Sequence, residues 1–290
     1  MPRFRPSLLQ SLLLALLGAG ACRDSHPDAR PASSRDAASP RRIVSLNPAT
    51  TEMLFALGAG ARVVGRTHWD SYPESARAVP DLGDGLRPNV EAVLAARPDL
   101  VILYASADNR AAEQRLRAAG VRTLSLRIDR LEDFVRAMEV LGNATGTADR
   151  AGVVVDSVQA SLERVARATA ALPRVRVFWH VWDNPVFTIG GGSYLTQLVD
   201  IAGGRNVYGE LAAASPQVTL EDVVRRDPDV ILAGPAGARS LRRSPAWHAV
   251  AAVSSGHILV VDTTLVGRPS VRLGEAARSL AALLHPGAVP

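Results

Sequence analysis

The feature of this sequence that most constrains its fold is a segment that occurs twice, 130 positions apart. The first copy is residues 89–102 (NVEAVLAARPDLVI), and the second is residues 219–232 (TLEDVVRRDPDVIL). Each copy predicts a short helix with a glutamate in its first turn, followed by a Pro-Asp turn and a buried apolar strand. The repeat therefore predicts two lobes of similar build, each presenting a glutamate at an equivalent place. Such a layout suits a bilobed binding protein that docks on a two-fold partner.

Length and composition allow two cores and argue against a nucleic-acid partner. The chain has 290 residues, enough for two ordinary domains, and 47% of them are hydrophobic. The formal charge is +5, but every basic residue is arginine, which we interpret as a bias in residue usage. Because no basic block lies beside aromatic residues, we expect no nucleic-acid groove.

Residues 1–21 have the pattern of a secretion signal. A positively charged start precedes an apolar run at 8–17, which is too short to span a bilayer, and small residues lead to Cys22. The position of this single cysteine, at the cleavage point, resembles a bacterial lipobox and predicts a lipid anchor at a membrane surface; a plain signal peptide is the alternative. Residues 22–41 begin with this cysteine. The part that follows it lacks a periodic apolar pattern and predicts a disordered tether.

The rest of the chain predicts an α/β fold with two Rossmann-like lobes. Strands alternate with helices over residues 42–145 and again over 173–290, which favours a parallel sheet in each lobe. In the first lobe, Thr50 or Thr51 is the expected cap of the first helix. Between the lobes, residues 146–172 repeat apolar side chains at three- and four-residue steps and predict one connecting helix of about 35–40 Å. A single stiff connector predicts small closure on ligand binding.

The chain also carries a set of motifs that are specific in combination. They are residues 42–52 (RIVSLNPATTE), Val64-Gly65 with Tyr72-Pro73, 97–102 (RPDLVI), 203–207 (GGRNV) and 216–218 (PQV). With these motifs the chain resembles the vitamin B12-binding proteins of bacterial ABC importers, within the wider periplasmic family that also binds ferric siderophores and haem. The resemblance covers most of residues 42–284. It implies two lobes joined by one long helix, a ligand in the cleft between them, and a location in the periplasm or at the cell surface.

Aromatic side chains are the candidate ligand contacts. Trp69 and Tyr72 follow the second strand of the first lobe, Tyr104 ends the strand of the first repeat, and Trp182 follows the first strand of the second lobe. Ligands in α/β folds bind beyond the carboxyl ends of strands. The resemblance implies that these rings grip a large flat macrocycle, whereas packing of each lobe's core is the alternative. For Trp179, within its strand, both are open.

Three departures from the resemblance concern the ligand. The B12-binding pattern has tryptophan where this chain has Gly83, Ser215 and Leu265. The expected cargo is cobalamin or a related corrinoid, and the alternative is a ferric siderophore or haem. In each case the metal belongs to the ligand, so the protein is expected to need no cofactor and no metal site of its own.

Charged and titratable residues near the expected cleft form a second group of candidates. His68 and His180 each follow a strand beside a tryptophan, which allows iron ligation from opposite lobes or simple polar packing. Arg268 lies in a segment that resembles a family segment at the cleft rim, so we expect it to contact an anionic ligand. Arg66 and Arg272 are weaker candidates for the same role.

The paired glutamates of the repeat have two compatible readings. Glu91 and Glu221 lie in the first turns of their helices, where a carboxylate is stabilised by the helix dipole. The resemblance implies in addition that each docks into an arginine pocket of a permease dimer that carries ATPase subunits. The partners expected for this chain are therefore the small-molecule cargo, that permease and the membrane, with the chain itself a monomer.

Enzyme activity is not expected. Gly190-Gly191-Gly192-Ser193 opens a helix and raises the possibility of phosphate binding, but Leu195 replaces the third glycine of a dinucleotide fingerprint. A structural turn is the preferred interpretation. No Gly-x-Ser-x-Gly motif is present, and no nucleophile and base are evident.

Overall fold

The computed structural model describes residues 39–287, which belong to one compact unit. The predicted signal peptide, Cys22 and all but the end of the predicted tether lie outside the described residues. Within the described residues, no helix combines the length and the apolar character needed to cross a membrane.

The N-terminal lobe contains a four-stranded parallel sheet in the order β2-β1-β3-β4. The first strand lies inside the sheet, and the helix after it returns the chain to one neighbouring position. The strand of the first repeat copy, β3, takes the other neighbouring position. The elements of this lobe are β1 (Ile43–Ser45), α1 (Pro48–Ala56), η1 (Gly60–Arg62), β2 (Val63–Gly65), η2 (Glu74–Ala78), α2 (Val90–Ala95), β3 (Leu100–Tyr104), α3 (Arg110–Ala118) and β4 (Arg122–Leu126).

The C-terminal lobe repeats this sheet. Its strand order is β10-β9-β5-β8, all parallel, which from the other edge is the N-terminal order with β8, β5, β9 and β10 in place of β2, β1, β3 and β4. Its elements are β5 (Val175–His180), β6 (Trp182–Asp183), β7 (Val186–Phe187), α6 (Tyr194–Ile201), β8 (Gly204–Asn206), α7 (Leu220–Arg226), β9 (Val230–Ala233), α8 (Pro235–Arg243), η3 (Ala246–Ala249), α9 (Ala251–Ser254), β10 (Ile258–Val260) and α10 (Thr263–Val266). The two-lobed parallel α/β class predicted from the sequence is confirmed.

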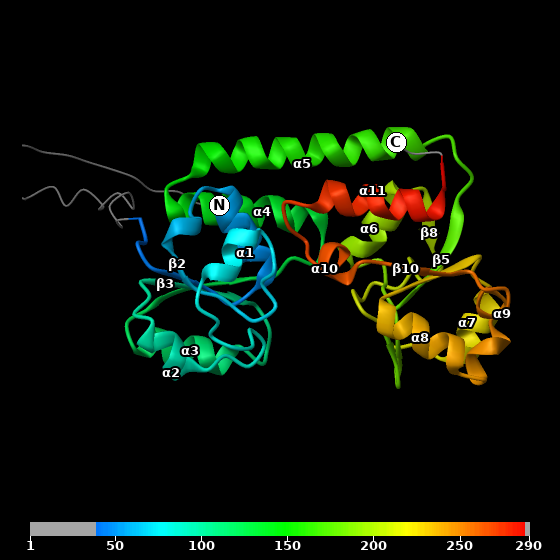
Figure 1. The fold of residues 1–290 in the computed structure, drawn as a ribbon, viewed down its shortest axis with the longest axis horizontal. Helices are drawn as coiled ribbons and strands as arrows, with labels where there is room; N and C mark the ends of the chain where they lie inside the picture. The colour runs from blue at the N-terminus through cyan, green and yellow to red at the C-terminus, as the bar shows by residue number, and fades with distance from the viewer. Residues whose placement is uncertain (1–38, 288–290) are drawn as a thin grey trace, which may run out of the picture. The chain divides into compact units, whose positions relative to one another are not determined.

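Three helices lie along one side of both lobes. They are α4 (Leu131–Thr145), α5 (Ala148–Thr169) and α11 (Leu273–Leu284). In Figure 1, α5 runs across both lobes, with α4 beside its first half and α11 beside its second half. The 22-residue α5 corresponds to a length of about 33 Å at 1.5 Å per residue, close to the predicted connector.

One apolar core crosses from lobe to lobe under these helices. Buried side chains of β1 and β3, of α4, α5 and α11, and of β5 and α6 belong to a single cluster, while each sheet has a smaller cluster on its other face. Because the lobes share this core, the exact domain boundaries at 145–146 and 172–173 stay a prediction. The shared core joins the two lobes along the α5 side of the molecule.

The repeat builds the same backbone frame in both lobes. The aspartate of each Pro-Asp turn accepts a hydrogen bond from the backbone of the lobe's first strand: Asp99 from the Arg42 amide at 3.1 Å, and Asp229 from the Arg176 amide at 2.7 Å. The side chains of Arg42 and Arg176 in turn donate to the last carbonyl groups of α2 and α7. In each copy the residue before the proline has a positive φ, 48° at Arg97 and 45° at residue 227.

Several local predictions were wrong. The cap of α1 is Asn47, whose side chain accepts from the Ala49 amide at 2.9 Å, rather than Thr50 or Thr51. The pattern analysis did not anticipate α4, α8 or the edge strand β8. Residues 246–254 form the two short helices η3 and α9, separated at Val250.

The triple-glycine segment is a packed turn, as preferred. A side chain on Gly190, Gly191 or Gly192 would overlap backbone carbonyl oxygens of residues 209–213. The amide of Gly191 donates to Leu211 at 2.7 Å, so it is already used within the protein. These glycines let two backbone segments approach closely before α6 begins.

Candidate functional site

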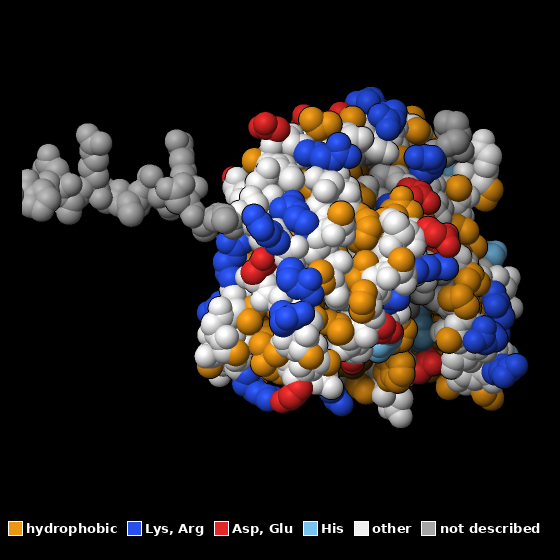
Figure 2. All heavy atoms as spheres, turned by 60° about the vertical axis from the view of Figure 1, so that its left-hand side comes forward, with side chains coloured by type: hydrophobic (Ala, Val, Ile, Leu, Met, Phe, Trp, Pro, Cys, Tyr) orange, Lys and Arg blue, Asp and Glu red, His pale blue; other side chains and the backbone are white. Residues whose placement is uncertain are grey.

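Two adjoining cavities lie between the lobes at the carboxyl ends of the strands. The N-terminal cavity has a volume of about 380 Å³, and the C-terminal cavity has about 640 Å³. Gly267 lines both, and the adjacent residues Tyr194 and Leu195 line one cavity each. The two cavities therefore form the two halves of one cleft, and Figure 2 shows hydrophobic and histidine side chains around a hollow in the surface.

The N-terminal cavity has an apolar wall with two aromatic rings. Trp69 comes from the loop after β2, and Tyr104 from the end of β3, as the sequence predicted. Leu86 and Pro48 add aliphatic surface, and Trp69 is 61% exposed. The pKa of Tyr104 is raised, first by burial and then by the nearby carboxylate of Asp129, so its phenol stays protonated at neutral pH. The cavity therefore combines flat apolar surface with polar side chains, those of Tyr104, Asn47, Asp84 and Asp129.

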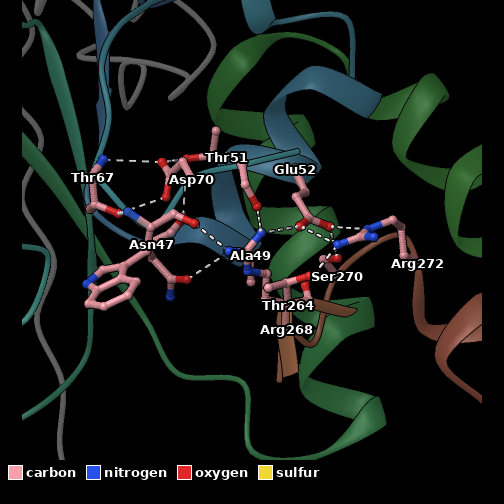
Figure 3. Close-up of polar contacts among 12 residues, drawn as sticks. Asn47, Ala49, Thr51, Glu52, Thr67, Asp70, Thr264, Arg268, Ser270 and Arg272 are labelled. Carbon is pink, nitrogen blue, oxygen red and sulfur yellow. Dashed lines mark hydrogen bonds and ion pairs between the residues drawn. The ribbon is translucent and has the colours of Figure 1, made fainter. Parts of the chain in front are cut away.

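Asp70 anchors the loop that carries Trp69 to α1 of the same lobe. The Asp70 carboxylate is buried and accepts hydrogen bonds from the Thr67 hydroxyl at 2.8 Å and the Thr51 hydroxyl at 2.7 Å. Burial raises the pKa of Asp70, although these hydrogen bonds act in the opposite direction. Because Asn47 caps α1, Thr51 is free to hold this loop. Figure 3 shows the loop fixed to the first helix of its own lobe.

The C-terminal cavity is formed by the end of β5, the β6–β7 hairpin and the start of α8. Trp182, at the beginning of the hairpin, lines it and is 63% exposed. Trp179 also lines it, but is buried and belongs to the shared core, so it takes part in both the core and the site. His180 is buried in its wall, with Nε2 2.7 Å from Asp183 Oδ1. The other oxygen of Asp183 accepts from the Ser240 hydroxyl at 2.6 Å. A carboxylate thus fixes the orientation of this imidazole.

The two histidines do not have equivalent surroundings. His68 is exposed, its ring lies 4.6 Å from the Trp69 ring, and it lines neither cavity. His180 lines the C-terminal cavity from a buried position. Over residues 39–287, no group of three or more His, Cys, Asp or Glu side chains is placed to hold a metal ion. Iron ligation by either histidine stays a prediction.

Arg268 is used for contacts between the lobes. Its guanidinium donates to Glu52 at 3.3 Å and to the Ser71 hydroxyl at 3.0 Å, and also to the backbone oxygen of Trp69. Glu52 is a fully buried residue of α1, so this is an ion pair across the lobe boundary (Figure 3). Gly267 lines the N-terminal cavity, whereas Arg268 does not. The guanidinium predicted to bind the ligand is therefore occupied by protein groups.

Arg272 and Ser270 complete what we call the Glu52 cluster, which comprises Glu52, Arg268, Ser270 and Arg272. Both carboxylate oxygens of Glu52 accept from Arg272 at 3.2 Å, and the Ser270 hydroxyl donates to the same carboxylate. The Arg272 guanidinium also lies 4.2 Å from the centre of the Tyr72 ring. Tyr72 lines neither cavity, and its ring packs against the Arg272 guanidinium instead.

Arg66 is likewise occupied within its own lobe. Its guanidinium donates to the carbonyl groups of Thr67, Ala76 and Arg77 at 2.7 to 3.2 Å. It therefore connects the start of the loop after β2 to η2. These contacts occupy the guanidinium of Arg66, as the Glu52 cluster occupies that of Arg272. Both weaker candidates for binding an anionic ligand are therefore already paired within the protein.

The two predicted docking glutamates are both exposed in the first turns of α2 and α7. In Figure 1 these helices lie at the ends of the lobes away from α5. Glu91 forms an ion pair with Arg115 of α3. Its pKa is lowered by a hydrogen bond from its own backbone amide and then by Arg115. Among residues 39–287, Glu221 forms no such ion pair, so the pair differs in its immediate partners.

Pattern analysis missed some of the cleft. Tyr194 is buried at the start of α6, lines the N-terminal cavity from the C-terminal lobe, and donates its hydroxyl to the Val266 carbonyl at 2.8 Å. The sequence signal for Tyr194 was its place directly after the glycine turn. There it is the first residue of α6, as Pro48 is the first residue of α1. The exposed Val181 and Leu86 gave no signal in the sequence.

Comparison with known proteins places this geometry among binding proteins. Residues 43–265 match the family model described as "Periplasmic binding protein". The chain is 29% identical over 255 residues to the uncharacterized ABC transporter substrate-binding lipoprotein YvrC of Bacillus subtilis, covering 85% of this chain and 81% of the relative. It is 28% identical over 278 residues to a cobalamin-binding protein of Halobacterium salinarum, covering 90% and 74%.

A solved structure agrees with the same architecture. The periplasmic heme binding protein from Pseudomonas aeruginosa superposes with a TM-score of 0.76 and 26% sequence identity, covering 86% of this chain and 94% of the other. The helical-backbone arrangement, in which one long helix connects two parallel-sheet lobes, is thus common to both.

Proposed function

We propose that this chain, which belongs to the periplasmic binding protein family, captures cobalamin or a related corrinoid in its interlobe cleft and delivers it to a membrane permease. At the coarser level the chain is a substrate-binding, non-enzymatic component of an ABC importer. The finer assignment of the cargo is supported by the shape and chemistry of the cleft.

The observation that carries the proposal is the pair of exposed tryptophans on opposite walls. Trp69 and Trp182 are 61% and 63% exposed and line the two halves of one cleft. Exposed indole rings that line a cleft offer flat apolar surface on which the face of a ligand can pack. With Tyr104, Leu86 and Val266 they give a cleft that suits a large macrocycle with apolar edges. The similarity to a cobalamin-binding protein adds support.

The proposal predicts a loss of affinity when either tryptophan is removed. Trp69→Ala and Trp182→Ala should each weaken cyanocobalamin binding by about 2 kcal/mol, or roughly 30-fold in Kd. The measurement is a titration of the purified protein with cyanocobalamin, hydroxocobalamin, haem and a ferric siderophore. Val153→Ala, which alters an exposed side chain on α5 outside the cleft, is the control and should leave the Kd unchanged. Absence of micromolar binding to any corrinoid would exclude the proposed cargo.

A second candidate cargo is haem or a ferric siderophore, favoured by one observation. The His180 imidazole is oriented by Asp183 at Nε2 and lies in the wall of the C-terminal cavity. Metal-ligating histidines are commonly oriented in this way by a carboxylate. If haem is the cargo, the purified protein should bind it with a Soret band that His180→Ala changes; His68→Ala tests ligation from the other lobe. A Soret band that neither substitution alters would exclude ligation by these histidines.

For delivery, we infer that Glu91 and Glu221 dock the lobes onto the permease dimer. Both carboxylates are exposed at lobe ends that lie on the same side, away from α5. Rim charges of this kind set orientation and association rate more than ligand affinity. Reversal of both to Lys should therefore abolish uptake of the cargo while leaving its Kd intact. The matched control is Glu163→Lys, an exposed reversal on α5, which should leave transport unchanged.

We further propose that Cys22 carries a lipid anchor that holds the protein at the membrane surface. The relative named a substrate-binding lipoprotein supports this assignment. Metabolic labelling with a radioactive fatty acid should mark the chain and fail to mark Cys22→Ser, and label retained by that variant would contradict it. A monomer is expected, because each lobe already supplies one half of the cleft.

A further inference from the structure

We propose that Arg268 is a positioning residue that holds the ligand-facing loop of the N-terminal lobe from across the lobe boundary. The inference rests on the proposed function in so far as Trp69 contacts the cargo. It replaces the role that the sequence predicted for Arg268, direct contact with an anionic ligand.

The first step of the argument is where Arg268 makes its bonds. Its three partners, Glu52, Ser71 and the Trp69 backbone oxygen, all belong to the N-terminal lobe, while Arg268 follows α10 of the C-terminal lobe. The guanidinium therefore connects one lobe to the residue that carries the exposed indole ring of the other. Only 12% of the Arg268 side chain is exposed, so water competes weakly for these bonds.

The second step is that side chains of both lobes bind the residues next to Trp69. From within its lobe, Asp70 binds Thr51 of α1 and Thr67. From the other lobe, Arg268 binds the residues on either side of Asp70, namely Trp69 and Ser71. The chain at Trp69 and Asp70 is consequently held by α1 of its own lobe, through Asp70, and by an arginine of the opposite lobe. Its position depends on how the lobes are arranged.

The third step concerns the carboxylate that fixes Arg268. Glu52 is completely buried and is shared between Arg268 and Arg272, each at 3.2 to 3.3 Å. A buried ion pair of this kind adds little net stability relative to an apolar contact, but it fixes geometry because breaking it leaves a charge without a partner. The Glu52 cluster is thus suited to setting the register between the lobes.

The fourth step connects the cluster to the cleft. Gly267 and Pro269, on either side of Arg268, line the N-terminal cavity together with Trp69. A ligand in this cavity touches the chain segment of Arg268 and the loop that Arg268 holds. Occupation of the cleft and the arrangement of the lobes are therefore coupled through one side chain that does not itself line the cavity.

The test separates positioning of Trp69 from general destabilisation. Because Trp179 and Trp247 are buried, Trp182→Phe leaves Trp69 as the exposed tryptophan, and Trp69→Phe leaves Trp182. In the ligand-free protein, Arg268→Met should change acrylamide quenching of Trp69 in the first background and leave quenching of Trp182 unchanged in the second. A change at both tryptophans, or at neither, would overturn the proposal.

A second junction between the lobes supplies the matched control. Gln197 of α6 accepts from the Leu131 amide of α4 at 2.9 Å and donates to Glu132, and it does not touch the Trp69 loop. Gln197→Met should leave Trp69 quenching as in the parent protein. If this substitution changes it as much as Arg268→Met does, the effect belongs to the lobe interface in general and the assignment of Arg268 is wrong.

Affinity provides the second readout, and a conservative variant guards against misfolding. Arg268→Met should weaken cyanocobalamin binding about tenfold, equivalent to roughly 1.4 kcal/mol. Arg268→Lys, which keeps a cation able to reach Glu52, should retain part of both the affinity and the quenching behaviour of the parent. If cyanocobalamin does not bind the parent protein, the proposed cargo fails while the quenching result still decides the positioning role. Equal Kd values for the parent and Arg268→Met, with binding intact, would refute the coupling.

Discussion

The two lobes share a backbone frame but differ in the side chains that form the cleft and the junctions between the lobes. Both sheets have the same strand order, and both use a Pro-Asp aspartate to bind the first strand and an arginine to bind the end of the repeat helix. These contacts pair backbone groups at the start of the first strand and at the end of the repeat helix, which are present in both lobes, so they recur. The cavity walls at the other end of the strands differ between the lobes, because each wall contacts a different part of the cleft.

The junctions between the lobes make the contrast sharpest. In each, the first helix of one lobe meets the start of the last helix of the other: α1 meets residues 268–272 before α11, and α6 meets residues 129–132 at the start of α4. The first junction is a buried ion cluster around Glu52, whereas the second uses the neutral side chain of Gln197. Equivalent places in the fold therefore carry different kinds of interaction, and only the charged one touches the ligand-facing loop.

The largest expected effect is on stability, and it tests whether the two junctions between the lobes differ in strength. Glu52→Ala leaves two buried arginines without their carboxylate, so we expect it to lower the free energy of unfolding by about 3–5 kcal/mol. Gln197→Ala removes one neutral hydrogen bond and one to the exposed carboxylate of Glu132, and it should cost about 1 kcal/mol. Chemical denaturation of the purified protein measures both. Equal losses would mean that the charged junction is not the more constraining of the two.

An intermediate effect tests the shared frame. Asp99→Ala and Asp229→Ala each remove a charged acceptor from backbone amides, and each should lower the free energy of unfolding by about 2 kcal/mol. We expect the two losses to be alike, since the bonds are the same in both lobes. Asp156→Ala, on the exposed surface of α5, is the control and should change stability little. A large loss at one aspartate alone would show that the repeat is not equivalent in its energetics.

The smallest effect concerns the difference between the paired glutamates. Since the backbone amide of its own helix turn and then Arg115 lower the pKa of Glu91, Arg115→Ala should raise that pKa partway toward the ordinary value of 4.5. A carboxylate whose pKa is lower in the folded than in the unfolded protein stabilises the fold at pH values above its unfolded-state pKa. This stabilisation is lost as the pH falls through its folded-state pKa. Nuclear magnetic resonance titration of the Glu91 side chain measures the change. No change in Arg115→Ala would mean that the ion pair of the structure is not populated in solution.

The paired segment, the alternation of strands and helices and the connector determined the architecture without any coordinates. The repeat predicted both sheets, because each copy contains a helix, a turn and a buried strand of unambiguous pattern. The same reasoning placed Trp69, Tyr104 and Trp182 at the carboxyl ends of strands, where the structure has them lining the cleft. Local signals of this kind act within a few residues, so the sequence alone expresses them.

Only the tertiary structure decided which partners the charged residues take. Nothing near Glu52 in the sequence indicates that it is buried against residues more than 200 positions away, and nothing near Arg268 indicates that its guanidinium binds the loop of Trp69. Arginine reaches far and binds any suitably placed oxygen, so its role follows from which segments the fold brings together. The two lobes were determined by local pattern, and the contacts that join them were determined by the packing of the whole chain.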